Sequence, residues 1–347
     1  MDKMLRNFWY LAVRGVMLRP GVTLPLKLLG DSVLIGRRRN GQVFAFSDRC
    51  PHRGMPLRHA RFAEDALRCC FHGWKFDVSD GRCIEIPSLD PQQKVDTRRF
   101  GLRAYPCREV QGNVWVFVPA RDGHPAADEL PPIPQVPVFG DRPPRVGATM
   151  RFPCPVDQAV IGFFDPAHPP YVHTSRWWRS TPAALRSKEK HYEPTALGFR
   201  MKRHALNNGA LPYRLLGRDP MIEIAIELPG IRVEHIEGTR HSVCVLAAAT
   251  PVDETTTEVH YCIYWTPRWM EPLKPIARWL TRAFLRQDRD VATKLVNSAN
   301  ESLPLLVGDP DAQIKWYYRL KGEYQRSQAA QQQFVNPIQP RTLRWRS

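Results

Sequence analysis

The chain has 347 residues, more than one ordinary hydrophobic core fills, so two domains are expected. A hydrophobic content of 43% and a charged content of 24% exclude a wholly disordered or fibrous protein. The formal net charge of +16 suits an anionic substrate or an acidic redox partner. The basic residues are scattered and no nucleic-acid-binding motif occurs, which argues against a nucleic-acid partner. No apolar run approaches a membrane span and no secretory signal is visible, so a cytoplasmic protein is expected.

The first 120 residues are predicted to form a small all-β domain. Residues 32–36, 42–47 and 113–118 are alternating or apolar runs of strand length, and Arg39-Asn40-Gly41 is a turn signal between the first two. No stretch with helical spacing interrupts them. A linker is predicted over residues 121–145, because eight prolines fall between Pro119 and Pro144 and proline lacks a backbone donor.

A second domain is predicted over residues 146–325. Strands of an antiparallel sheet are expected at residues 199–204, 221–228, 242–249 and 257–265. A helix is expected over residues 275–298, with Ile276, Leu280, Phe284, Val291 and Leu295 on one apolar stripe. Residues 326–347 are Gln- and Arg-rich and are expected to be a loosely ordered tail. The fold class is therefore α+β.

Two short segments of the first domain pair a cysteine with a histidine. Cys50 and His52 are two positions apart, Cys69 and His72 are three apart, and each pair has a nearby glycine. Two thiolates and two imidazoles can bind zinc or a two-iron cluster. Zinc fingers usually pair Cys with Cys and His with His, whereas here each half supplies one of each. This arrangement suits a cluster whose two irons have different ligand sets.

The segment resembles a Rieske iron–sulfur domain, including Gly73 and Trp74 after the second pair. The resemblance implies a [2Fe-2S] cluster in which Cys50 and Cys69 hold one iron and His52 and His72 hold the other. Respiratory Rieske proteins carry an extra cysteine in each loop, where this chain has Met55 and Phe71. The pattern is therefore similar to the oxygenase and ferredoxin branch.

A second histidine pair follows the linker. Asp165, His168 and His173 have the spacing D-x-x-H-x-x-x-x-H, among prolines that stiffen the backbone. Downstream of a Rieske segment, this spacing is similar to the mononuclear iron motif of Rieske non-haem iron oxygenases. The resemblance then extends over nearly the whole chain. It implies that His168 and His173 bind iron(II), and that the second domain is a helix-grip (START-like) catalytic domain with an antiparallel sheet.

A third iron ligand is expected from the helix predicted at residues 275–298. Asp288 lies on its apolar stripe, whereas Asp290 has polar neighbours and faces water. A carboxylate on a buried face is costly unless it is paired or bound to a metal. The Gln287-Asp288 pair is also similar to the family's third-ligand motif. Asp288 is therefore the predicted ligand, and it would complete a triad of two histidines and one carboxylate that leaves positions open for O2.

Asp165 matches the family's bridging aspartate, which is a catalytic residue and not an iron ligand. The resemblance implies that it joins His168 to His72 of a neighbouring subunit, which requires a head-to-tail ring, usually a homotrimer. Many relatives have Asp-Asn where this chain has Ile161 and Gly162. A hydrogen-bonding role of that Asn would then be absent or supplied by Asp157 or Gln158.

The resemblance implies the terminal oxygenase component of a multicomponent system, of the single-subunit monooxygenase or demethylase type. It would use O2 to hydroxylate or oxidatively demethylate a small aromatic or polycyclic substrate. No G-x-G-x-x-G fingerprint occurs, so electrons are expected from a separate NAD(P)H-dependent reductase or ferredoxin. The alternative is a Rieske electron carrier fused to a ligand-binding domain without oxygen chemistry.

Overall fold

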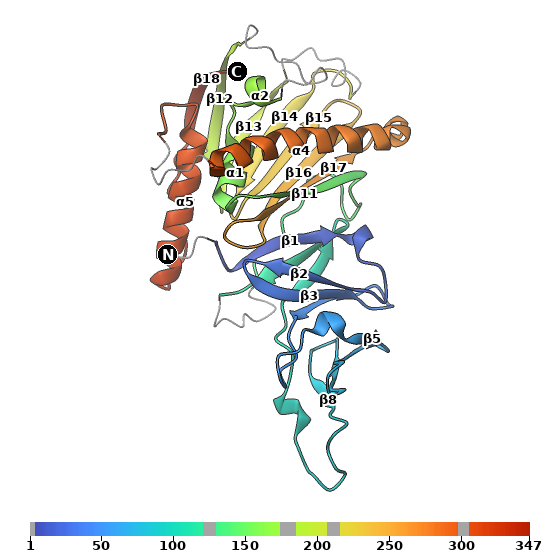
Figure 1. Cartoon of the computed structure of the whole chain (residues 1–347). Coiled ribbons are helices and arrows are strands. Elements are labelled where there is room, and N and C mark those ends of the chain that lie inside the picture. The colour runs from blue at the N-terminus through green and yellow to red at the C-terminus, as the bar shows by residue number, and fades with distance from the viewer. Residues whose placement is uncertain (1–3, 121–129, 174–184, 207–215, 298–304) are drawn as a thin grey trace. The chain divides into compact units, whose positions relative to one another are not determined.

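Figure 1 shows the computed structural model, which describes residues 4–120, 130–173, 185–206, 216–297 and 305–347. The chain divides into two compact units, one of residues 6–133 and one of residues 134–347 together with 1–5. Residues 130–145 of the predicted linker contain no helix or strand, and residues 121–129 lie outside the described ranges. No helix in the described part of the chain is long and apolar enough to cross a membrane.

The first unit is built from antiparallel strands and short 3-10 turns, so the prediction of an all-β domain is confirmed. Among the described residues, these strands form three sheets. The first contains β1 (Phe8–Arg14), β10 (Asn113–Val118) and β9 (Cys107–Val110), and the second contains β2 (Thr23–Leu28), β3 (Asp31–Arg37) and β4 (Val43–Ser47). The third contains β5 (Arg61–Ala63), β6 (Ala66–Arg68), β7 (Lys75–Asp77) and β8 (Cys83–Glu85). The 3-10 turns are η1 (Gly15–Met17), η2 (Leu57–His59) and η3 (Thr97–Arg99).

The two loops that carry the predicted cluster ligands each begin at the end of a strand. The first loop follows β4, and the second joins β6 to β7. Cys50 and Cys69 belong to one buried hydrophobic cluster, to which Phe44, Leu67 and Phe76 also contribute. The core of the unit therefore holds the two cysteine-bearing loops against each other.

The second unit contains an eight-stranded antiparallel sheet among the described residues, as the sequence predicted. In spatial order its strands are β11 (Val146–Phe152), β17 (Thr257–Trp265), β16 (Ser242–Pro251), β15 (Ile231–Glu237), β14 (Met221–Glu227), β13 (Gly198–Ala205), β12 (Ser187–Pro194) and β18 (Arg341–Arg346). Most neighbours in space are also neighbours in the chain, as expected of a sheet built from hairpins.

Helices cover one face of this sheet, and the longest, α4 (Lys274–Asn297), runs across the strands (Figure 1). It packs against β11 and against α1 (Val156–Phe164). Among the described residues, the other helical elements are α2 (Pro169–Val172), η5 (Arg268–Leu273) and α5 (Ala312–Ala329). The predicted helix over residues 275–298 is therefore present.

The buried face of α4 is different from the predicted stripe. Thr281, Leu285 and Ala292 are buried, whereas Ile276 is 57% and Leu295 is 53% exposed. Ile276 lies nine positions before Leu285, which places it about 180° around a helix of 3.6 residues per turn. The predicted stripe spans only about 100°, but it is centred about 100° away from the face that is buried. Asp288 lies between the two, and its side chain is only 8% exposed.

The C-terminal segment is not a loose tail. Residues 312–329 form α5, and β18 pairs with β12 along its whole length. Leu343 and Trp345 are buried while Arg344 and Arg346 are exposed, the alternation expected of a strand with one buried face. The high content of Gln and Arg concealed this short alternation.

If β18 is part of the core, Leu343→Ala should destabilise the second unit by about 2–4 kcal/mol, because it leaves a cavity at a fully buried site. Arg344→Ala removes an exposed side chain of the same strand and should change stability little. Urea unfolding followed by tryptophan fluorescence compares the two variants. Equal urea midpoints for the two variants would mean that β18 adds nothing to the stability of the core.

Candidate metal centres

Two loops of the first unit have the same backbone hydrogen bonds. In the first, the Cys50 N–H donates to Met55 O (2.8 Å) and the Gly54 N–H to Cys50 O (2.9 Å). In the second, the Cys69 N–H donates to Trp74 O (2.9 Å) and the Gly73 N–H to Cys69 O (3.0 Å). Gly54 and Gly73 have φ of +73° and +72°, a region that L side chains rarely adopt. The two loops therefore form a matched pair, and each turn requires its glycine.

The four predicted cluster ligands lie at the facing ends of these loops. The imidazole rings of His52 and His72 are 4.7 Å apart between centroids, and His52 stacks on Trp74 at 4.7 Å and 9°. Burial raises the pKa of the Cys50 thiol to about 11, an effect that the Cys69 thiol increases. Burial, His72 and Arg53 together lower the pKa of His52.

This donor set fits a two-iron cluster. Imidazole nitrogens can donate lone pairs to iron, and iron would take the place of the protons on two close, buried thiols. The stacking of His52 on Trp74 is a contact that sequence analysis missed, although it had noted Trp74 as part of the resemblance.

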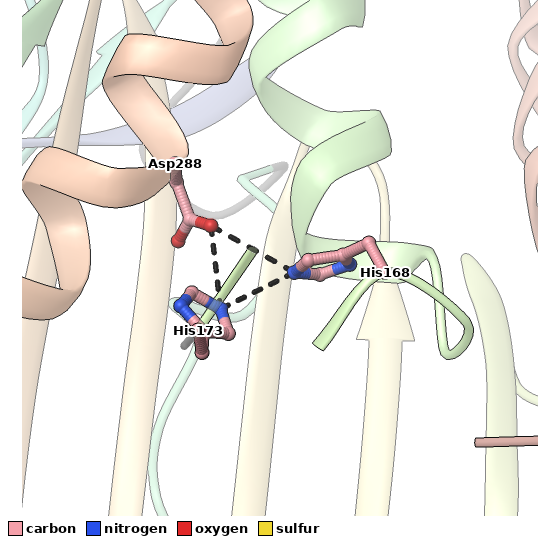
Figure 2. Close-up of side chains that lie close together, drawn as sticks. All are labelled: His168, His173 and Asp288. Atoms are coloured by element: carbon pink, nitrogen blue, oxygen red, sulfur yellow. Dashed lines mark hydrogen bonds and ion pairs between the residues drawn. The ribbon is translucent and has the colours of Figure 1, made fainter. Parts of the chain in front are cut away.

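The second site forms where three chain segments meet (Figure 2). Helix α1 ends at Asp165, His168 precedes α2, and His173 follows it. Asp288 extends from α4 toward both imidazoles. Asp290, the rejected alternative, is 59% exposed and pairs with Arg289 at 2.9 Å. The structure thus brings together the three residues chosen as iron ligands.

The facing atoms of this triad are close enough to share one metal ion. His168 Nε2 and His173 Nε2 are 3.3 Å apart, and Asp288 Oδ1 lies 3.7 Å from the first and 3.3 Å from the second. Ligand atoms that bind one ion at about 2.1 Å along perpendicular bonds lie about 3 Å apart. Small side-chain adjustments would therefore satisfy a facial arrangement.

Hydrogen bonds on the far sides of the imidazoles fix which nitrogen faces the centre. His168 Nδ1 lies 2.9 Å from the main-chain oxygen of Asp165, which can only accept, so Nδ1 donates. His173 Nδ1 donates to Gln287 Oε1 at 3.0 Å, and Phe284 stacks on the ring at 3.8 Å. Both Nε2 atoms therefore present lone pairs to each other, which is unfavourable unless a cation lies between them.

The electrostatics also fit a cation. Burial lowers the pKa of His173 to about 4 and also lowers the pKa of His168, so both rings are neutral near pH 7. Burial raises the pKa of Asp288 to about 7, although the charge of Arg232 opposes the effect. Two neutral imidazoles and a desolvated carboxylate are a donor set for a divalent transition metal such as iron(II).

The triad faces a cavity of about 560 Å3. Its lining includes Phe163 and Phe164 of α1, Phe284 of α4, and residues of β12 to β15 and β17.

Gly162 also lines the cavity, and a side chain at this position would meet open space. Asp157 cannot replace the Asn that relatives have there, because Tyr317 and Lys321 each donate to it at 2.6 Å.

Asp165 lies beside His168 in the segment between α1 and α2. Its main-chain oxygen accepts the hydrogen bond of His168 Nδ1, its carboxylate accepts from the Ala167 N–H at 2.7 Å, and Oδ2 is 3.8 Å from His168 Nδ1.

Sequence analysis missed the hydrogen bond between Gln287 and His173, whose only signal was the position of Gln287 next to Asp288.

Gln287→Leu should weaken divalent metal binding at the triad about 10- to 100-fold, because His173 loses the acceptor that orients it. Anaerobic titration of metal-depleted protein with Fe(II) measures this affinity. Arg286→Gln is the control, since this neighbour on α4 is exposed. An unchanged affinity of the Leu variant would show that the hydrogen bond does not support the site.

Comparison with known proteins assigns the first unit. A family model described as the Rieske [2Fe-2S] domain matches residues 8–106. The 3-chlorobenzoate-3,4-dioxygenase oxygenase subunit of Comamonas testosteroni is 36% identical over 132 residues, which cover 38% of this chain and 29% of the relative. Chloroplastic chlorophyllide a oxygenase of Chlamydomonas reinhardtii is 34% identical over 183 residues, or 51% of this chain and 26% of the relative. The matches thus span about a quarter to a third of these relatives.

The fold of the whole chain also has a known counterpart. The crystal structure of dicamba monooxygenase bound to dicamba superposes with a TM-score of 0.74 at 20% sequence identity, covering 94% of this chain and 98% of that one. The chain therefore contains a Rieske [2Fe-2S] domain at residues 8–106, its relatives include oxygenase subunits, and its fold is that of the dicamba monooxygenase structure.

Proposed function

We propose that this chain is the terminal oxygenase of a multicomponent system. Cys50, His52, Cys69 and His72 would hold a Rieske [2Fe-2S] cluster, and the triad of His168, His173 and Asp288 would hold a mononuclear iron(II). The observation that carries the proposal is the triad itself: two imidazoles with bare Nε2 atoms and one buried carboxylate, gathered within 4.8 Å of one another at the wall of a cavity.

When bound, the cluster supplies one-electron transfer and the mononuclear iron supplies a site for O2 activation. The residues of the chain set the conditions for this chemistry. The Asp165 carbonyl and Gln287 hold the two rings in the tautomer that frees Nε2. Phe284 packs on His173 and reduces the access of water to the triad from that side.

The proposed reaction is hydroxylation or oxidative demethylation of a small organic substrate, with electrons from a separate reductase or ferredoxin. The cavity of about 560 Å3 is large enough for an aromatic or polycyclic compound. A relative named as a 3-chlorobenzoate-3,4-dioxygenase oxygenase subunit is in line with a small aromatic substrate.

The proposal includes a head-to-tail homotrimer. In this arrangement the Asp165 carboxylate would link His168 to His72 of a neighbouring subunit, and so connect a cluster to the iron of the next chain. What supports this role is that the Asp165 side chain is 25% exposed and that its Oδ2 lies 3.8 Å from His168 Nδ1. The link would require Nδ1 to turn from the Asp165 main-chain oxygen, its present acceptor, toward the carboxylate.

Electron paramagnetic resonance on anaerobic, dithionite-reduced protein, with and without nitric oxide, tests the two centres. Wild type should give a Rieske signal and a high-spin iron–nitrosyl signal. Asp288→Ala should lose the nitrosyl signal, the mononuclear iron and turnover, while the Rieske signal stays. Asp290→Ala should retain everything, because this carboxylate is exposed and lies outside the triad.

Two outcomes would contradict the proposal. Full activity of the Asp288→Ala variant would remove Asp288 from the metal site. A Rieske signal without a nitrosyl signal in iron-supplemented wild type would favour the alternative, an electron carrier with a ligand-binding domain.

A further inference from the structure

Strand β12 places two lysines on the inner wall of the cavity. Lys188, Lys190 and Tyr192 share one face of the strand, and all three line the cavity. The strand's other face carries Glu189 and His191, which are exposed. Glu189 borders the same cavity, but its carboxylate already pairs with Arg344 on the neighbouring strand β18 at 2.8 Å. Its charge is therefore balanced by a side chain other than the two lysines.

The two lysines have no anionic partner within the part of the chain that the structure describes. No ion pair or hydrogen bond joins either ammonium group to a carboxylate there. Burial lowers the pKa of both side chains, and the charge of Lys188 lowers that of Lys190 further. Two partly buried like charges are costly unless an anion lies between or beside them.

Two arginines, Arg186 and Arg232, also line the cavity, and Arg232 is in a different state from the lysines. Arg232 on β15 pairs with Glu234 at 2.7 Å, and its charge acts on both His168 and Asp288. It therefore belongs to the surroundings of the triad and already has a carboxylate partner. The lysine pair, together with the exposed Arg186 that precedes β12, is the cationic part of the wall that remains for a ligand.

An apolar surface separates the lysines from the triad. Met201 of β13 and Ile222, Ile224 and Ile226 of β14 line the cavity between β12 and β15. Neighbouring strands lie about 4.8 Å apart, so the three steps from β12 to β15 span about 14 Å. The cavity thus has a cationic end, an apolar middle and a metal-facing end.

We infer that Lys188 and Lys190 anchor the oxyanion of an elongated substrate, a carboxylate or sulfonate whose apolar body extends across β13 and β14 toward the triad. The inference rests on the proposed function, because it assigns the substrate class of the same cavity. An ammonium pair attracts an oxyanion without requiring one fixed geometry, so both anion types fit. The anchor holds the far end of the substrate and leaves the other end facing the metal.

Calorimetric titration of anaerobically purified full-length protein tests the anchor without requiring turnover. The probes are biphenyl-4-carboxylate, biphenyl-4-sulfonate and the neutral biphenyl-4-carboxamide, which share one apolar body. Wild type should bind at least one of the anions about tenfold or more tightly than the amide. Added salt should weaken binding of the anions and not of the amide.

Lys188→Gln combined with Lys190→Gln should abolish this preference and leave amide binding unchanged. Lys188→Arg combined with Lys190→Arg should retain it, which excludes a folding defect as the cause. The control is Lys202→Gln combined with Lys315→Gln, which removes the same charge from two exposed positions. It should bind all probes as wild type does.

Equal binding of anions and amide by wild type, or an unchanged preference in the double Gln variant, would overturn the anchor. These outcomes differ from failure of the proposed function, which is read from the iron–nitrosyl signal. Anion preference without that signal would keep the anchor and reject the oxygenase. The signal without anion preference would keep the oxygenase and reject the anchor.

Discussion

The approach of two imidazole nitrogens without hydrogens to a buried carboxylate is the constraint on which the second unit depends. His168 and His173 cannot turn away, because their other nitrogens donate to fixed acceptors. Asp288 cannot reach water easily, since its side chain is only 8% exposed. Helix α4 must cross the sheet where it does for these atoms to meet. Without a cation, this arrangement combines facing lone pairs with a desolvated acid, which is costly.

The two centres are assembled by different means. The cluster ligands come from two short loops that repeat one hydrogen-bond pattern, and each loop is local in sequence. The triad joins two histidines five residues apart to a carboxylate more than a hundred residues later, so it exists only when the second unit has folded. The first centre thus depends on turn geometry, and the second depends on the packing of α4.

Local features were predictable from the sequence, and long-range ones were less so. The spacing of Cys50, His52, Cys69 and His72 determined the Rieske assignment, because loop motifs are contiguous. Asp288 was separated from Asp290 by helical periodicity, although the same reasoning misplaced Ile276 and Leu295. The lysines of β12 and the strand β18 were missed, because their role depends on which strands become neighbours. Strand β18 pairs with β12, about 150 residues earlier in the chain, and its only signal in the sequence is a short alternation of apolar and polar residues.

The position of β18 links the end of the chain to the shape of the cavity. Trp345 lies opposite Lys188 and Leu343 opposite Lys190, and Trp345 itself lines the cavity. The last few residues therefore form part of the wall farthest along the sheet from β15, whereas the triad comes from α4 and from the segment around α2. Mutations in β18 can thus reshape ligand fit while both candidate metal centres stay intact, which gives this protein a separate region in which specificity can evolve.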